Sequence, residues 1–215
     1  MTMTPSLRML ALTAHVTSSV GWLGAVTVFL ALAIAGVTSK DHQMVRAVYL
    51  AMGLTVSYVI VPLAFASLLS GLVLALGTKW GLFRHYWVMI KFLLTALATI
   101  VLLMQLESIR YLADAAADPT TSVPVVREAA LRPLIHAAGG LVVLFMVQVL
   151  GVYKPWGMTL YGRRKQHAQG DTPAAPHRGS TTGTPRWLYV SGTIVIVLVL
   201  LFIAVHLAGW GPRGH

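Results

Sequence analysis

The sequence predicts an all-α fold, a polytopic membrane helix bundle with five transmembrane helices. Only 10% of the 215 residues are charged and 57% are hydrophobic, whereas ordinary soluble domains carry roughly 25% charged residues. Five apolar windows also reach the ~20 helical residues that are needed to cross the ~30 Å hydrocarbon core of a bilayer. We therefore expect a membrane protein whose main partner is the lipid bilayer.

The five windows divide the chain almost completely into membrane helices. The first is about twice as long as the 7–15 apolar residues of a secretory signal, so we expect it to be retained as a helix. Pro62 lies inside the second window and is expected to kink that helix, because proline removes one backbone hydrogen bond. The windows are residues 9–38, 47–78, 86–106, 133–153 and 187–210.

The composition also predicts the domain organisation. Residues 1–165 are expected to form a four-helix membrane core, and residues 187–215 a fifth transmembrane helix with a short tail. Residues 166–186 between them are rich in glycine, proline, serine and threonine. Such a composition buries too little apolar surface to fold, so we expect a flexible cytoplasmic linker there.

The charges in the loops predict the orientation. With the N-terminus inside, the cytoplasmic segments hold nine lysines and arginines and the opposite segments six, which agrees with the positive-inside rule. Asp114, Asp118 and Glu128 make the third loop acidic and suit it to the outer face. We expect a cytoplasmic N-terminus and an external C-terminus. The net charge of +10 then indicates attraction to anionic lipid and not binding to nucleic acid.

Four ionisable side chains lie inside the apolar windows, namely Lys91, His15, His136 and His206. A lysine at the centre of a membrane helix costs about 2.5–3.5 kcal/mol, so an ionisable residue there indicates a functional site. The alternative for Lys91 is a side chain that extends along the helix to the membrane surface. The function therefore depends on what these four residues hold.

Counting helical turns sorts these residues into two levels. His15 and Lys91 lie close to the cytoplasmic ends of their windows and share one level. His136 lies near the start of its window and His206 near the end of its window, so they share the opposite level. Glu107 and Gln105 belong to that second level.

The neighbours of the histidines suggest a binding slot. His136 is followed by Gly139 and Gly140, at the offsets that stack on one helical face, and serines occupy the same offsets from His15. A porphyrin needs such a slot, because haem iron commonly takes an axial histidine. Small residues also serve plain helix packing in membranes, so haem binding and packing both remain open.

Several segments resemble known families of bacterial membrane proteins. Residues 14–24, AHVTSSVGWLG, resemble the first helix of CopD-like and HemJ-like proteins, in which Trp-x-Gly follows a histidine by two turns. Residues 80–95 look like their third helix, with an aromatic entry and a lysine. Residues 153–159, YKPWGMT, are similar to a helix exit in a family of bacterial, often actinobacterial, integral membrane proteins of unknown function. The likeness spans residues 10–165 and implies the bacterial plasma membrane.

The resemblance has two functional implications. HemJ-like proteins are haem-associated protoporphyrinogen oxidases, so the likeness implies a membrane oxidoreductase in which His15 and Lys91 match the functional histidine and lysine. The CopD-like resemblance implies copper handling instead. The chain departs from the first family by its fifth helix and additional histidines. It departs from copper transporters by having no cysteine and only scattered methionines.

Taken together, the residues predict a b-type haem-binding electron-transfer module. His15, Lys91 and His136 are the expected haem ligands or contacts, and a redox protein or a quinone is the expected partner. One alternative is a copper-handling permease component that uses His136, His206 and Glu107, a ligand set suited to Cu(II) or zinc. Another is a structural membrane protein with no ligand.

Overall fold

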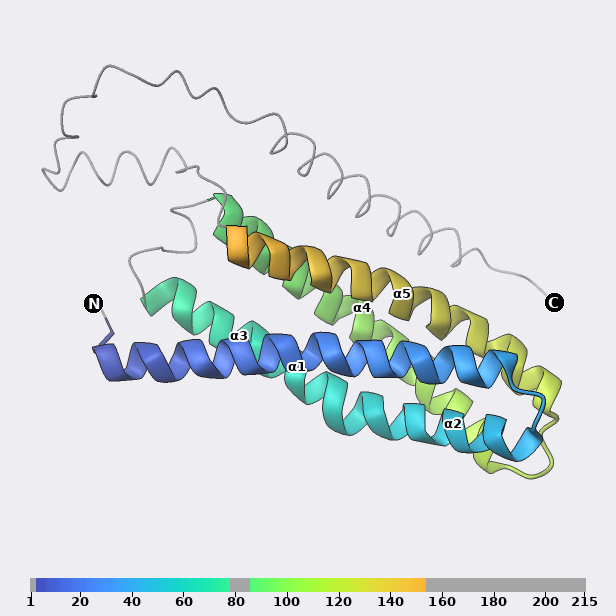
Figure 1. Cartoon of the computed structure of the whole chain (residues 1–215). Helices are drawn as coiled ribbons and strands as arrows, with labels where there is room; N and C mark the ends of the chain where they lie inside the picture. Colours follow the sequence, from blue (N-terminus) through green and yellow to red (C-terminus); the bar gives the residue numbers. More distant parts are fainter. Residues whose placement is uncertain (1–2, 78–85, 154–215) are drawn as a thin grey trace, which may run out of the picture.

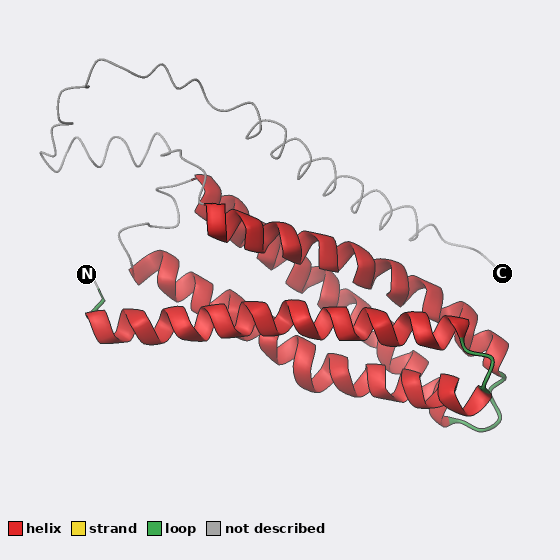
Figure 2. Cartoon of the chain, viewed as in Figure 1, coloured by secondary structure: helices red, strands yellow, loops and turns green. Residues whose placement is uncertain are grey.

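The computed structural model of the protein describes residues 3–77 and 86–153 (Figure 1). Every element in these ranges is a helix, and they contain no strand (Figure 2). The predicted linker at 166–186 and the predicted fifth helix at 187–210 lie outside the described residues. The elements are α1 (Pro5–Thr38), α2 (His42–Thr55), a π-helical turn (Val56–Ile60), α3 (Val61–Gly77), α4 (Tyr86–Ala117) and α5 (Val123–Tyr153).

Four helical segments are long and apolar enough to cross a membrane, and they have between 28 and 36 residues. The all-helical fold and four of the predicted membrane helices are thereby confirmed within the described ranges. Such segments exceed the ~20 residues of a simple crossing, so their ends project from the hydrocarbon core or the helices tilt. The spans are Pro5–Thr38, His42–Gly77, Tyr86–Ala117 and Val126–Tyr153.

The second span contains the predicted disturbance at Pro62. The π-helical turn Val56–Ile60 lies directly before it, and the backbone N–H of Val61 donates to the carbonyl of Val56, five residues back. A proline inside an α-helix crowds the carbonyl four residues earlier, here that of Tyr58. The wider π-helical turn relieves this crowding, so α2 continues into α3 as one span.

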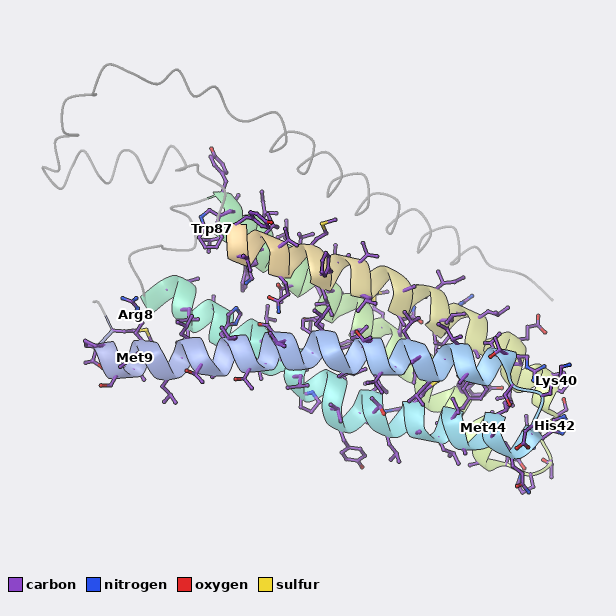
Figure 3. The ribbon with its side chains drawn as sticks, in the orientation of Figure 1. Arg8, Met9, Lys40, His42, Met44 and Trp87 are labelled. Carbon is purple, nitrogen blue, oxygen red and sulfur yellow. The ribbon has the colours of Figure 1, made fainter. Side chains whose placement is uncertain are left out.

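The four spans form an antiparallel bundle. Helices α1 and α4 each pack against the second span and against α5, so α1 and α4 lie diagonally across the bundle (Figure 1). We call the end with residues 39–41 and 118–122 the short-loop end. The other end is the Arg8 end, where α1 begins and α5 ends (Figure 3).

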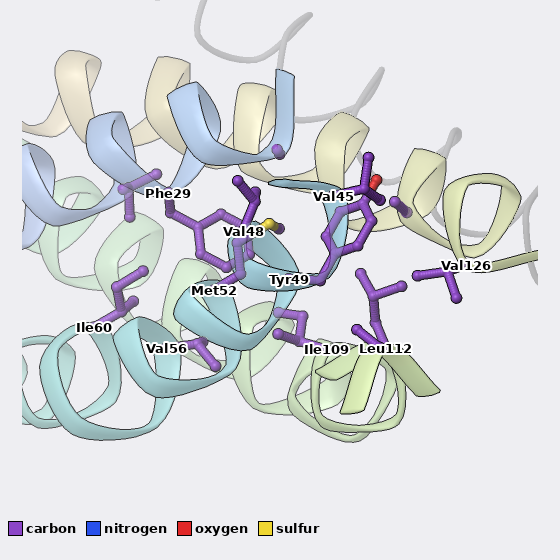
Figure 4. Packing of buried hydrophobic residues seen from close by; sticks show 14 of the residues in the cluster. Phe29, Val45, Val48, Tyr49, Met52, Val56, Ile60, Ile109, Leu112 and Val126 are labelled. Atoms are coloured by element: carbon purple, nitrogen blue, oxygen red, sulfur yellow. The ribbon is translucent and has the colours of Figure 1, made fainter. Parts of the chain in front are cut away.

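The main hydrophobic core extends from the middle of the bundle to the short-loop end. Its largest fully buried side chains come from the second span, from α4 and, with Val126, from α5, and Phe29 of α1 packs among them (Figure 4). A second, smaller cluster of Leu94, Val143 and Val147 joins α4 to α5 nearer the Arg8 end. Packing in a membrane rests mainly on such van der Waals contact, because lipid is as apolar as the core.

Two arginines hold the short-loop end together. The guanidinium of Arg46 on α2 donates to the carbonyls of Ala116 and Asp118, at 3.0 and 2.6 Å. Arg127 on α5 donates to the carbonyl of Ser39, at 2.5 Å. Cations at a helix C-terminus satisfy its unpaired carbonyls and complement its dipole. These two positive charges therefore serve the fold of the short-loop end.

The loop between α4 and α5 keeps a negative charge beside Arg46. The carboxylate of Asp118 accepts hydrogen bonds at 2.8 Å from the backbone N–H and from the hydroxyl of Thr120. These bonds stabilise the ionised form and lower the pKa of Asp118, with smaller contributions from the Thr121 hydroxyl and the charge of Arg46.

Helices α4 and α5 are longer than their apolar windows predicted. Helix α4 was expected to end at residue 106 and runs to Ala117, because Ile109, Leu112 and Ala116 recur at helical spacing and are buried. Helix α5 was expected to begin at residue 133 and begins at Val123. His136 therefore lies well inside α5, whereas the window placed it near the start of the helix.

Candidate functional site

A cavity of about 70 Å³ lies between the four spans, near the middle of the bundle. Trp22 and Phe29 of α1 form aromatic parts of its wall, and the second span, α4 and α5 supply the rest. Apart from Gln105 and His136, the described lining residues are apolar. A site of this volume is large enough for several water molecules, since one needs ~10–15 Å³ by the same kind of measure.

His136 presents a defined tautomer to this cavity. Its Nδ1 lies 2.8 Å from the carbonyl oxygen of Arg132, one turn earlier on α5. A carbonyl only accepts, so Nδ1 carries the proton and, in the neutral ring, Nε2 carries the lone pair. Histidines that ligate metals commonly hold their other nitrogen in this way. His136 shares this feature of its Nδ1 with ligating histidines.

The space beside His136 is open, as the glycines predicted. A Cβ built on Gly140, one turn further along α5, would meet no atom within 4 Å. Gly140 and Ala137 both line the cavity with His136. Gly140 therefore does not serve close contact with a neighbouring helix at this point.

Gln105 faces the same cavity from α4 and was not chosen from the sequence as a ligand. Its side chain is 7% exposed, and its Oε1 has no hydrogen-bond partner among the described residues. An unpaired buried polar group costs about 1–3 kcal/mol. The only feature of the sequence that could have pointed to Gln105 is its polar amide inside an apolar window. The arrangement calls for a water or a ligand that offers a donor to this oxygen.

The predicted metal set is only partly represented near the cavity. Glu107 is exposed and does not line the cavity, because two residues along a helix turn its side chain away from Gln105. His206 lies outside the described residues. Among the residues that the structure does describe, no three histidine, cysteine or acidic side chains gather to hold a metal ion. The set His136, His206 and Glu107 stays a prediction.

His15 connects α1 to α3. Its Nδ1 lies 3.1 Å from both the carbonyl of Ser67 and the hydroxyl of Ser70, and Ser19 meets Ser67 through their hydroxyls at 2.9 Å. Its ring rests on Gly71, where an added Cβ would lie 3.0 Å from Cε1. This is the packing role that the sequence left open beside haem binding.

Lys91 lies at the same level, as predicted. Its Nζ occupies space that Gly151 of α5 leaves free, because an added Cβ there would lie 2.8 Å from Nζ. Lys91 and His15 are close enough for their charges to interact. Neither residue lines the cavity that contains His136. The structure thus separates two polar levels, one around His136 and Gln105 and one around His15 and Lys91.

Comparisons with protein-family models, with curated proteins and with solved structures find no match for this chain. The resemblance to CopD-like and HemJ-like proteins therefore rests on the segments quoted above. A function has to be argued from the chemistry of the two levels.

Proposed function

We propose that this multi-pass membrane protein is a b-type haem-binding electron-transfer module with His136 as an axial ligand. One observation carries the proposal. The Nδ1 of His136 is held by the Arg132 carbonyl next to the open space at Gly140, so in the neutral ring Nε2 is the nitrogen that would bind the iron. Proteins bind haem iron through an axial ligand such as histidine, and the identity of that ligand and the polarity of the pocket set the reduction potential of the haem.

The number of ligands favours haem over copper. A bare zinc ion takes three or four protein ligands, and copper sites likewise combine several. Within the described residues, the cavity provides one imidazole and one amide. A porphyrin brings four nitrogens of its own, so a single imidazole is enough to hold it. The copper-handling alternative has no comparable support.

The residues fit haem in chemistry, and the cavity has to widen to admit it. About 70 Å³ is less than the ~150 Å³ of an engineered cavity that binds benzene. Apolar side chains such as Leu97 and Val101 of α4 would have to move. Trp22 and Phe29 would then pack against the bound ring, and the Oε1 of Gln105 would still take its hydrogen bond from a water molecule. The bound group supplies one-electron transfer, with a redox protein or a quinone as partner.

A visible spectrum of the purified protein tests this proposal. Protein from cells that are supplied with a haem precursor is expected to show a Soret band, with haem and chain in equal amounts by pyridine haemochrome assay. Haem added to ligand-free protein in detergent should shift the haem spectrum and saturate. A protein with no Soret band, and no spectral change on adding haem, would contradict the proposal. Copper found by elemental analysis in its place would favour the alternative.

We further propose the plasma membrane as location, with a cytoplasmic N-terminus and an external C-terminus. The loop charges support it, and the margin widens when Arg46 and Arg127, which bind helix carbonyls, are set aside. The chain has no cysteine, so single cysteines can be labelled without background. In intact cells, an impermeant maleimide should label Thr120→Cys and spare Ser180→Cys until the membrane is permeabilised. The reverse pattern would overturn this orientation.

A further inference from the structure

The geometry points to an anion-binding site at Lys91, which takes the phosphate of an anionic lipid headgroup or of free phosphate. The ammonium lies between α4 and α5, against Gly151 and close to the residue where α5 ends. A cation inside a membrane helix is costly unless it is solvated or paired. The site is separate from the cavity at His136 and does not depend on haem.

The described bundle offers Lys91 no negative partner. Five of the acidic residues lie in the described ranges, and all five are in the half toward the short-loop end, opposite Lys91; they are Asp41, Glu107, Asp114, Asp118 and Glu128. His15, which lies at the same level as Lys91, adds no negative charge. The sixth acidic residue, Asp171, lies outside the described residues and is tested below.

The surroundings of Lys91 match the membrane surface on that side. Tyr86 and Tyr153, at the beginning of α4 and the end of α5, are exposed, and Trp87 and Arg8 lie at the same end (Figure 3). Aromatic residues of this kind mark the headgroup level of a bilayer. The ammonium therefore lies just below the depth at which lipid phosphates lie.

The sequence after α5 strengthens the attraction. Basic pockets between membrane helices on the cytoplasmic side bind anionic headgroups, and neighbouring lysines and arginines concentrate such lipids. A group of cations follows α5 along the chain, and it consists of Lys154, Arg163, Arg164 and Lys165. We therefore expect an anionic lipid such as phosphatidylglycerol as the ligand, because the sequence that follows α5 is strongly basic.

The test measures lipid retention by the full chain with native mass spectrometry, after purification with phosphatidylglycerol and phosphatidylcholine in equal amounts. The native protein should retain phosphatidylglycerol. Lys91→Met should lower its retention about fivefold, the effect of one lysine near an anionic surface, and Lys91→Arg should preserve it. Lys40→Met removes an exposed lysine at the short-loop end and should leave retention unchanged.

Gly151→Ala gives a second readout that keeps the charge. Its Cβ would lie 2.8 Å from Nζ, so the ammonium has to move. Lipid retention should then fall, while the thermal midpoint of unfolding stays near that of the native protein.

Inorganic phosphate added to the protein separates the two sources of the anion. Phosphate that displaces the lipid would identify free phosphate as the ligand, and lipid retained in its presence would identify the headgroup. Equal retention in Lys91→Met and native protein would overturn the proposal. A second result would also overturn the proposal. If Asp171→Asn lowers the stability of the protein, and Lys91→Met added to it lowers the stability no further, then Lys91 is paired with Asp171 and not with an anion.

Discussion

A His136→Gly protein is expected to lose the Soret band of the native protein, and imidazole added to the solution is expected to restore it. The substitution removes the ring that carries the proposed axial nitrogen and leaves a hole of its shape. The hole adjoins Gly140, where a Cβ would meet nothing within 4 Å, so a free imidazole has room to enter. A glycine inside a helix costs only about 0.5–1 kcal/mol relative to alanine, and the bundle should still form.

The controls for this experiment separate the two levels of the bundle. His42→Gly changes an exposed histidine at the start of α2 (Figure 3) and should keep the native spectrum. His136→Ala should lose the band without restoration, or with weaker restoration, because the methyl group fills part of the hole. A band that survives in His136→Gly and disappears in His15→Ala would place haem at the level of His15 and Lys91, as the HemJ-like resemblance implies.

A Gly53→Ala protein is expected to lose about 1–3 kcal/mol of unfolding free energy, the usual cost of overpacking a filled interior. Helices α2 and α4 meet closely at Gly53, where an added Cβ would lie 2.6 Å from the Cβ of Ala113. Both atoms are fixed to helix backbones, so neither can swing aside and the helices have to separate. Unfolding in mixed micelles by increasing denaturing detergent measures this loss.

Two variants show whether this loss comes from the contact. Gly24→Ala adds the same methyl group to α1 at a place where nothing lies within 4 Å, and it should be neutral or slightly stabilising through helix propensity. Ala113→Gly combined with Gly53→Ala moves the methyl group from one helix to the other and should recover most of the loss. A double variant no more stable than Gly53→Ala would show that crowding between these two residues is not the cause.

Within the described ranges, the sequence was sufficient to predict four membrane helices and the shared level of His15 and Lys91. Both depend on properties that are local along the chain: the length of an apolar run and the count of helical turns from its end. The ends of α4 and α5 were missed because their outer turns are amphipathic, and a window average over mixed residues falls even where Ile109 and Leu112 are buried. The vacancy beside His136 was predicted, because Gly140 follows at the offset that shares its face.

The partners of these residues were decided only by the tertiary structure. Gln105 and Glu107 are two residues apart, and the sequence favoured Glu107 as a ligand. The packing of α4 against α5 instead buries the amide of Gln105 beside His136 and leaves the carboxylate of Glu107 exposed. His15 meets Ser67, and Lys91 meets Gly151, across helices that are distant along the chain. Hydrophobicity specifies that a helix is buried in the membrane, but which face meets which neighbour depends on how the side chains of all four spans fit together.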